Sequence, residues 1–327
     1  AAGREQRRGR RRRLAVRLRG DFGLNGAAVP AAEASAADAT FLDHVGLFVP
    51  DRARAASALE RLGFALTPFT PQRHTLTSGE LVPAGTANRL AVLRQGYIEI
   101  LTAIGETPLA AQMRQATGRY AGAHLIAFGT ADAEGTHARL AEQGFAPLPL
   151  VRLQRAAATL AGERVARFSV VRVPPDRMPE GRMQFCRHHT PELVWQPHQQ
   201  RHPNGAHALT DILLCVADVA EAAARYARFV GRPAQAREGF RLIELGRGRL
   251  HLFEPPQLRA ATGIEAPTTP FIAGFALTTA DLAATRALLT ERGAPIRPLA
   301  PDVIAAAPDA IATTILLTEF DANLPWL

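Results

Sequence analysis

Four residues with metal-ligating side chains lie inside stretches that otherwise read as apolar strands. They are His44 in FLDHVGLFVPD, Glu99 in GYIEIL, His124 in GAHLIAFG and Gln184 in GRMQFC. An ionisable group inside a core is costly unless it is paired or bound to a metal. Two imidazoles and one carboxylate suit a borderline divalent metal, with the amide oxygen as a weak fourth ligand. The residues predict one divalent metal per chain, and leave iron, zinc, nickel, cobalt and manganese equally open.

An internal repeat explains how residues so far apart in the chain can meet. Each copy has a strand, an aspartate that begins a helix, and a glycine 12 or 13 residues later that ends it. Aspartate accepts hydrogen bonds from the free N–H groups of a helix start, and glycine adopts the left-handed conformation past its end. The four pairs are Asp51 with Gly63, Asp132 with Gly144, Asp218 with Gly231, and Asp281 with Gly293. Strand-like runs follow each helix, so each copy is predicted to be a βαβββ module.

Aligning the modules places the candidate ligands at equivalent positions. His44 aligns with His124, Asp211 and Ala273 on the first strands. Glu99 aligns with Gln184 and His251 on the last strands, and Thr313 or Thr314 stands in the fourth module. Two modules packed about a local twofold axis bring these strands to one curved face. The first pair of modules therefore predicts a site, whereas the second predicts a degenerate copy that packs, dimerises or covers the first.

The predicted fold class is α+β, with four βαβββ modules paired into two tandem domains of curved, mostly antiparallel sheets. The first domain is expected over residues 41–198 and the second over 208–327, joined by a connector at 199–207 in a stretch rich in proline, histidine and glutamine. Residues 1–40 are interpreted as a disordered arginine-rich arm and linker.

Composition excludes several classes of function. The net charge of +8 belongs wholly to residues 1–20, which hold nine arginines and one glutamate, so the folded part is neutral and no nucleic-acid partner is expected. No apolar run is long enough to span a membrane. Cys186 and Cys215 lack a metal-type CxxC spacing, which favours a reducing, cytoplasmic compartment. Motifs for nucleotide binding and for serine hydrolysis are missing.

The repeated stretches LDHVGLFV, GYIEIL and GAHLIAFG resemble the vicinal oxygen chelate superfamily, especially its glyoxalase-like branch. The resemblance covers about residues 41–327 and is strongest over 41–208. It implies paired βαβββ modules around a metal held at the positions of His44, Glu99 and His124. Gln184 departs from the glyoxalase I pattern, which usually has a second glutamate that transfers a proton.

Residues around this predicted centre are candidates for substrate contact and catalysis. Asn88 and Arg89 stand at a strand entry, where they could fix a polar or anionic substrate, although a plain turn explains them equally well. CRHHTPELVWQP follows the last strand of the first domain. We expect a general base among Glu192, His188 and His189, and a pocket wall at Trp195. Strand alternation lets only one of the two histidines face the site.

Three functions remain open from the sequence. The leading one is a glyoxalase-like, metal-dependent enzyme that moves a proton on a small substrate chelated through vicinal oxygens. An extradiol-type iron(II) dioxygenase is the second, because two histidines and one carboxylate form the usual facial triad. The third is a non-catalytic protein that binds or sequesters small molecules. A small-molecule ligand and a possible homodimer are the expected partners.

Overall fold

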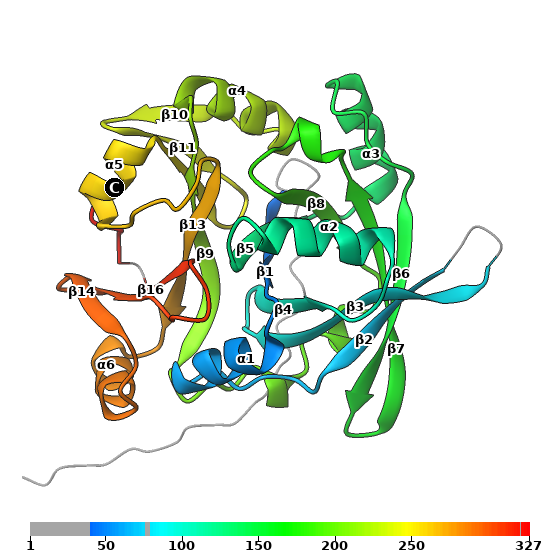
Figure 1. The fold of residues 1–327 in the computed structure, drawn as a ribbon, viewed down its shortest axis with the longest axis horizontal. Helices are drawn as coiled ribbons and strands as arrows, with labels where there is room; N and C mark the ends of the chain where they lie inside the picture. Colours follow the sequence, from blue (N-terminus) through cyan, green and yellow to red (C-terminus); the bar gives the residue numbers. More distant parts are fainter. Residues whose placement is uncertain (1–39, 76–78, 321) are drawn as a thin grey trace, which may run out of the picture. The chain divides into compact units, whose positions relative to one another are not determined.

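Two eight-stranded sheets organise the chain, which is described by a computed structural model over residues 40–75, 79–320 and 322–327 (Figure 1). The first sheet is a closed barrel with the strand order β1-β4-β3-β2-β6-β7-β8-β5. Its strands are β1 (Phe41–Phe48), β2 (Thr70–Thr75), β3 (Leu81–Val92), β4 (Tyr97–Ala103), β5 (Gly122–Gly129), β6 (Val151–Thr159), β7 (Gly162–Arg172) and β8 (Arg182–His188). The predicted arm and linker lie outside the described residues, except for Thr40.

The second sheet is open and has the order β10-β11-β12-β9-β13-β16-β15-β14. Its strands are β9 (Ala206–Cys215), β10 (Ala234–Arg237), β11 (Phe240–Glu244), β12 (Arg249–Phe253), β13 (Phe271–Thr279), β14 (Ile296–Ala300), β15 (Val303–Ala306) and β16 (Thr314–Glu319). In both sheets the first and last strands of each module pair in parallel and the other neighbours pair antiparallel. The α+β class with mostly antiparallel, curved sheets is confirmed.

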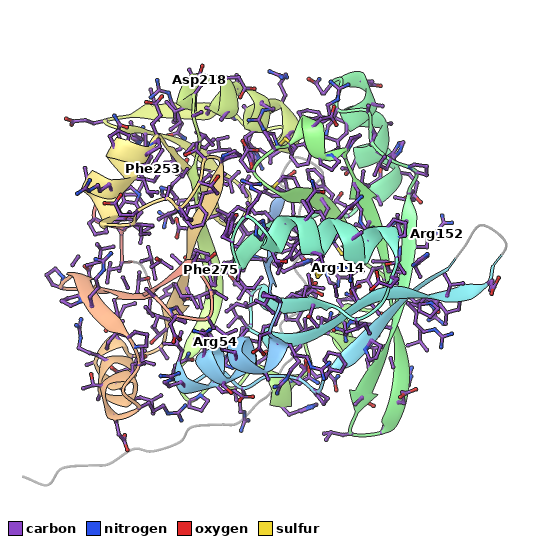
Figure 2. The ribbon with its side chains drawn as sticks, viewed as in Figure 1. Arg54, Arg114, Arg152, Asp218, Phe253 and Phe275 are labelled. Carbon is purple, nitrogen blue, oxygen red and sulfur yellow. The ribbon has the colours of Figure 1, made fainter. Side chains whose placement is uncertain are left out.

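Four helices begin and end where the repeat predicts. They are α1 (Arg52–Arg61), α3 (Ala133–Glu142), α4 (Val219–Val230) and α6 (Leu282–Glu291). Each is capped by the expected aspartate, whose carboxylate accepts backbone N–H groups of the first turn. Asp218, for example, lies exposed at the start of α4 (Figure 2). The glycine after each helix has a positive φ, from 59° at Gly293 to 82° at Gly63. Two further helices, α2 (Pro108–Thr117) and α5 (Pro255–Thr262), follow β4 and β12 and were not predicted.

The two sheets share one apolar core and belong to one compact unit, residues 35–327. Leu42 and Ile126 of the barrel pack in the same buried cluster as Ile212 and Phe275 of the second sheet. Backbone hydrogen bonds also join the halves, as from Leu42 N to the carbonyl of Arg247 at 2.8 Å. Burial of this apolar surface holds the barrel strands in fixed positions, which a site built from several strands requires.

Register in the barrel determines which residues face its interior. His44 on β1 is level with Tyr97 on β4 and with Ala127 on β5, and Ala127 is level with Gln184 on β8. Glu99 is level with Gly46, one pleat further along β1. Because side chains of alternate residues share a face, His44, Glu99 and Gln184 lie on the inner wall.

Candidate functional site

A cavity of about 350 Å³ occupies the barrel interior and is lined by residues of all eight barrel strands and of α2. Its apolar wall comes from leucines, valines and Phe168, which lie on several strands and on α2. Its polar wall consists of His44, Gln72, Arg73, His74, Asn88, Tyr97, Glu99, Thr107, Gln154, Arg155, Arg172, Arg182, Gln184 and Cys186. A hollow in which apolar side chains and convergent polar groups meet is typical of a small-molecule site.

His44 is held by the residue that precedes it. Its Nδ1 lies 2.6 Å from Oδ2 of Asp43, and both side chains are almost fully buried. Adjacent residues of a regular strand face opposite sides, but the pairing of β1 with β5 slips at Asp43, as in a β-bulge. The carboxylate can only accept, so Nδ1 carries the proton and Nε2 presents its lone pair. His44 Nε2 is thus free to bind a metal or accept a proton.

Glu99 is oriented towards that same nitrogen. Its Oε1 accepts hydrogen bonds from Asn88 Nδ2 at 2.5 Å and from Gln72 Nε2 at 3.2 Å. Thr86 Oγ1 in turn donates to Gln72 Oε1 at 2.6 Å. The other oxygen, Oε2, lies 3.8 Å from His44 Nε2. Partners that fix a ligating side chain from behind are a regular feature of metal sites.

Gln184 supplies an unused oxygen on the same wall. Its side chain is buried, and Oε1 has no hydrogen-bond partner among the residues that the structure describes. A buried polar atom without a partner carries a free-energy cost that a ligand or ion would remove. His44 Nε2, Glu99 Oε2 and Gln184 Oε1 together form one nitrogen and two oxygen donors, and this set fits a divalent metal. The orphaned amide oxygen is the observation that favours an occupant.

His124 lies outside this group. It does not line the cavity; its Nε2 bonds to the carbonyl of Tyr120 at 2.8 Å, and its ring stacks on Tyr120. Burial lowers the pKa of His124 to about 4. Leu125, the next residue, occupies the position on the cavity wall instead. The structure therefore brings together three of the four predicted ligands.

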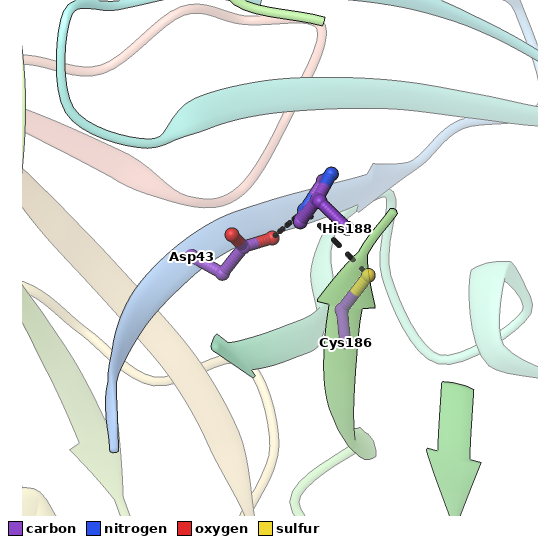
Figure 3. Close-up of side chains that lie close together, drawn as sticks. All are labelled: Asp43, Cys186 and His188. Atoms are coloured by element: carbon purple, nitrogen blue, oxygen red, sulfur yellow. Dashed lines mark hydrogen bonds and ion pairs between the residues drawn. The ribbon is translucent and has the colours of Figure 1, made fainter. Parts of the chain in front are cut away.

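His188 belongs to a buried cluster behind His44, where Figure 3 shows Asp43 and Cys186 on either side of its ring. His188 Nε2 lies 3.0 Å from Asp43 Oδ2 and 3.6 Å from Cys186 Sγ. Although burial opposes it, the Asp43 carboxylate raises the pKa of His188 well above its ordinary value. The pKa of Asp43, which burial alone would raise, is held far below its usual range by His188 and His44. Asp43, Cys186 and His188 form a second donor set with metal-binding geometry.

The other predicted catalytic residues do not reach the cavity. Glu192 is exposed in the turn η2 (Pro191–Leu193). His189 is also exposed, and its Nε2 lies 2.8 Å from Ser169 Oγ. Trp195 packs edge-on against Tyr97 and His188, behind the cavity wall.

The predicted substrate residues Asn88 and Arg89 face opposite ways. Asn88 lines the cavity and holds Glu99. Arg89 donates to the carbonyl of Thr67 and pairs with Glu60 at 3.1 Å.

Several residues on the cavity wall escaped the sequence analysis. They are Gln72 and His74 on β2, Arg155 on β6, Arg172 on β7 and Arg182 on β8. Asp43, which lies behind His44, was missed as well. One signal was present, since Arg182 precedes Gln184 by two residues and must share its face. The position of Arg155 follows from barrel closure, where β2 pairs with β6 at Arg73 and His74, and no local pattern predicts that pairing.

The second sheet carries a polar cluster at the aligned positions, but its partners satisfy one another. Asp211 Oδ1 lies 2.7 Å from His251 Nε2 and 2.6 Å from Arg249 Nε. Trp326 donates from Nε1 to His251 Nδ1 at 3.1 Å. Both ring nitrogens of His251 are thus occupied, and this cluster has the character of a structural network.

Comparison with known proteins assigns the fold. A family model described as a glyoxalase-like domain matches residues 42–230. No curated protein matches the chain. Among solved structures, a hypothetical protein from Staphylococcus aureus has a TM-score of 0.60 at 10% identity, over 86% of this chain and all of that one.

Two further solved structures are similar in fold. A variant of 4-hydroxymandelate synthase from Streptomyces coelicolor has a TM-score of 0.56 at 13% identity, covering 87% of this chain and 94% of its own. A fusion of a xylose isomerase-like TIM barrel with a 4-hydroxyphenylpyruvate dioxygenase has a TM-score of 0.57 at 14% identity, over 90% of this chain. This chain spans about half of that fusion protein, 51%. In the described part of the chain, no helix has both the length and the apolar character needed to cross a bilayer.

Proposed function

Because this chain belongs to the glyoxalase-like family of the vicinal oxygen chelate superfamily, we propose that it is a metal-dependent enzyme that transfers a proton on a small substrate. His44 Nε2, Glu99 Oε2 and Gln184 Oε1 would hold the metal. The supporting observation is the pair of oriented donors, His44 Nε2 and Glu99 Oε2, 3.8 Å apart on the cavity wall. A bound divalent metal supplies Lewis-acid polarisation of the two neighbouring substrate oxygens.

The surrounding residues fix this geometry. Asp43 keeps the proton of His44 on Nδ1, so that Nε2 stays available. Asn88 and Gln72 hold Glu99 Oε1, so that Oε2 stays turned towards His44. Apolar side chains on the cavity wall lower the local dielectric constant, which strengthens the electrostatic contacts beside them.

His74 is our candidate for the proton-accepting group. It lines the cavity on β2, two residues beyond Gln72, whose side chain holds Glu99. Gln184 stands where glyoxalase I has a second glutamate, and an amide cannot accept the proton. A neutral imidazole has a ring nitrogen whose lone pair can accept the proton.

Binding of a small molecule without catalysis is the second candidate function. It is favoured by Gln184, whose amide cannot accept a proton. The iron(II) dioxygenase alternative needs two imidazoles at one metal, and His124 is turned away from the cavity. Free, buried thiols at Cys186 and Cys215 support the proposal of a reducing, cytoplasmic compartment.

Calorimetric titration with Zn²⁺, Ni²⁺, Mn²⁺ and anaerobic Fe²⁺ tests the metal site. We expect one metal per chain, at least 100-fold weaker binding in His44→Ala and Glu99→Gln, and unchanged binding in the matched control His124→Asn. Equal losses in His44→Ala and His124→Asn, or none in either, would refute the assignment. His74→Gln should keep the metal; if it also keeps turnover, His74 is not the base.

A further inference from the structure

Three arginines line the cavity without a hydrogen-bond or ion-pair partner among the described residues. Arg155 on β6, Arg172 on β7 and Arg182 on β8 all line it. In the described part of the chain, their side chains form no hydrogen bond or ion pair, and Arg172 Nε is buried without a partner. Arg155 lies over the ring of Phe168 and Arg182 over that of Phe48, at 5.7 and 5.0 Å from the centroids. The aromatic rings fix these two arginines without neutralising them.

The charge of the cavity is unbalanced. Its described lining holds four arginines, counting Arg73, but only one acidic residue, Glu99. Glu99 is committed to Asn88 and Gln72 through Oε1. Like charges brought together in a half-buried wall are costly, and an anion in the cavity removes that cost.

We propose that the cavity binds an organic anion whose carboxylate or phosphate group lies against Arg172 and Arg182 and whose apolar body lies against the leucine and valine wall. Arg172 is level with Gln184, and Arg182 is two residues before Gln184 on the same face. Both arginines therefore start from positions next to Gln184 on the barrel wall. Planar guanidinium forks match the two oxygens of a carboxylate or phosphate.

The inference rests on the proposed function, because it names the substrate class of the same cavity. A substrate that holds the metal through two neighbouring oxygens, with its anionic group on the arginines, would be fixed at both ends. An anionic substrate would also make a divalent metal near several arginines less costly. Its negative charge offsets part of the positive charge of the metal and the arginines.

Calorimetry with benzoate, phenylphosphonate and the neutral benzyl alcohol tests the proposal on metal-free protein in EDTA. Both anions should bind at least 10-fold more tightly than benzyl alcohol. The one that binds more tightly shows whether the cavity prefers a carboxylate or a phosphate-like group. Arg172→Gln and Arg182→Gln should each weaken the anions at least 10-fold, and Arg182→Lys should restore part of the loss. Arg167→Gln, on an exposed position of the same strand β7, should change nothing.

Equal binding of benzyl alcohol and benzoate, or full anion affinity in both glutamine variants, would overturn the inference. Metal titration of Arg182→Gln separates it from the proposed function. If Arg182→Gln no longer binds the anion but still binds the metal, both the proposed function and the anion-binding inference are supported. If the wild type binds the anion through its arginines but binds no metal, only the proposed function fails. Thermal unfolding of each variant without ligand reports folding, and removal of an unpaired cation should leave Tm unchanged or higher.

Discussion

Oδ2 of Asp43 lies 2.6 Å from Nδ1 of His44 and 3.0 Å from Nε2 of His188, so one buried carboxylate oxygen orients two imidazoles. Only His44 turns its other nitrogen to the cavity. The arrangement links the predicted metal position to the polar cluster behind it, and it makes Asp43 a positioning residue.

Asp43→Asn should weaken metal binding by about 10- to 100-fold, because the residue that fixes His44 is lost. The substitution also leaves the His188 imidazolium without its carboxylate partner, which should lower the free energy of unfolding by about 3 kcal/mol. Calorimetric metal titration and urea unfolding measure the two effects. Asp51→Asn, an exposed helix cap with a retained acceptor, is the control. Unchanged metal affinity in Asp43→Asn would show that Asp43 does not position His44.

Asn88→Ala should weaken metal binding by about 10-fold, since Glu99 Oε1 loses its 2.5 Å donor and its carboxylate becomes mobile. Arg89→Ala is the matched control, because the neighbouring side chain contacts Thr67 and Glu60 instead. Isothermal calorimetry of both variants decides the matter. A loss in Arg89→Ala as large as that in Asn88→Ala would contradict the assigned role.

The site shows what a single sequence can and cannot predict. His44 lies 7 residues before its helix cap Asp51, whereas His124 lies 8 before Asp132. Counted from the cap, the residue equivalent to His44 is Leu125, which does line the cavity. A shift of one residue along a strand turns the side chain to the opposite face. The repeat therefore predicted where the strands lie. The side of β5 on which His124 lies could be known only from the pairing register of that strand.

His124 should make the protein acid-sensitive. Its folded pKa of about 4 lies below the ordinary 6.5, so the folded state holds it neutral while the unfolded state takes up a proton. Its contribution is present above pH 6.5 and is lost as the pH falls towards 4, by about 3 kcal/mol in total.

Urea unfolding at pH 7, 5.5 and 4 measures this loss. His124→Asn has no titrating group at that position and should lose correspondingly less stability between pH 7 and pH 4. An identical pH dependence in wild type and His124→Asn would show that His124 is not buried as a neutral ring.

Asp211→Asn should lower the free energy of unfolding and leave the metal affinity unchanged. The carboxylate of Asp211 pairs with Arg249 and His251 in the second sheet, and both lose their negatively charged partner when it becomes an amide. Removing one partner of a buried charge pair costs about 3 kcal/mol. Urea unfolding and metal titration, run on the same preparation, test both halves of the expectation. A metal affinity lowered together with stability would assign the second sheet a part in the site.

Metal bound directly in crystals gives the most direct test of the central assignment. Crystals grown with Mn²⁺ or Ni²⁺ should show an anomalous difference peak bonded to His44 Nε2, Glu99 Oε2 and Gln184 Oε1, facing the cavity. A peak among Asp43, Cys186 and His188 instead, or none at full metal loading, would contradict it.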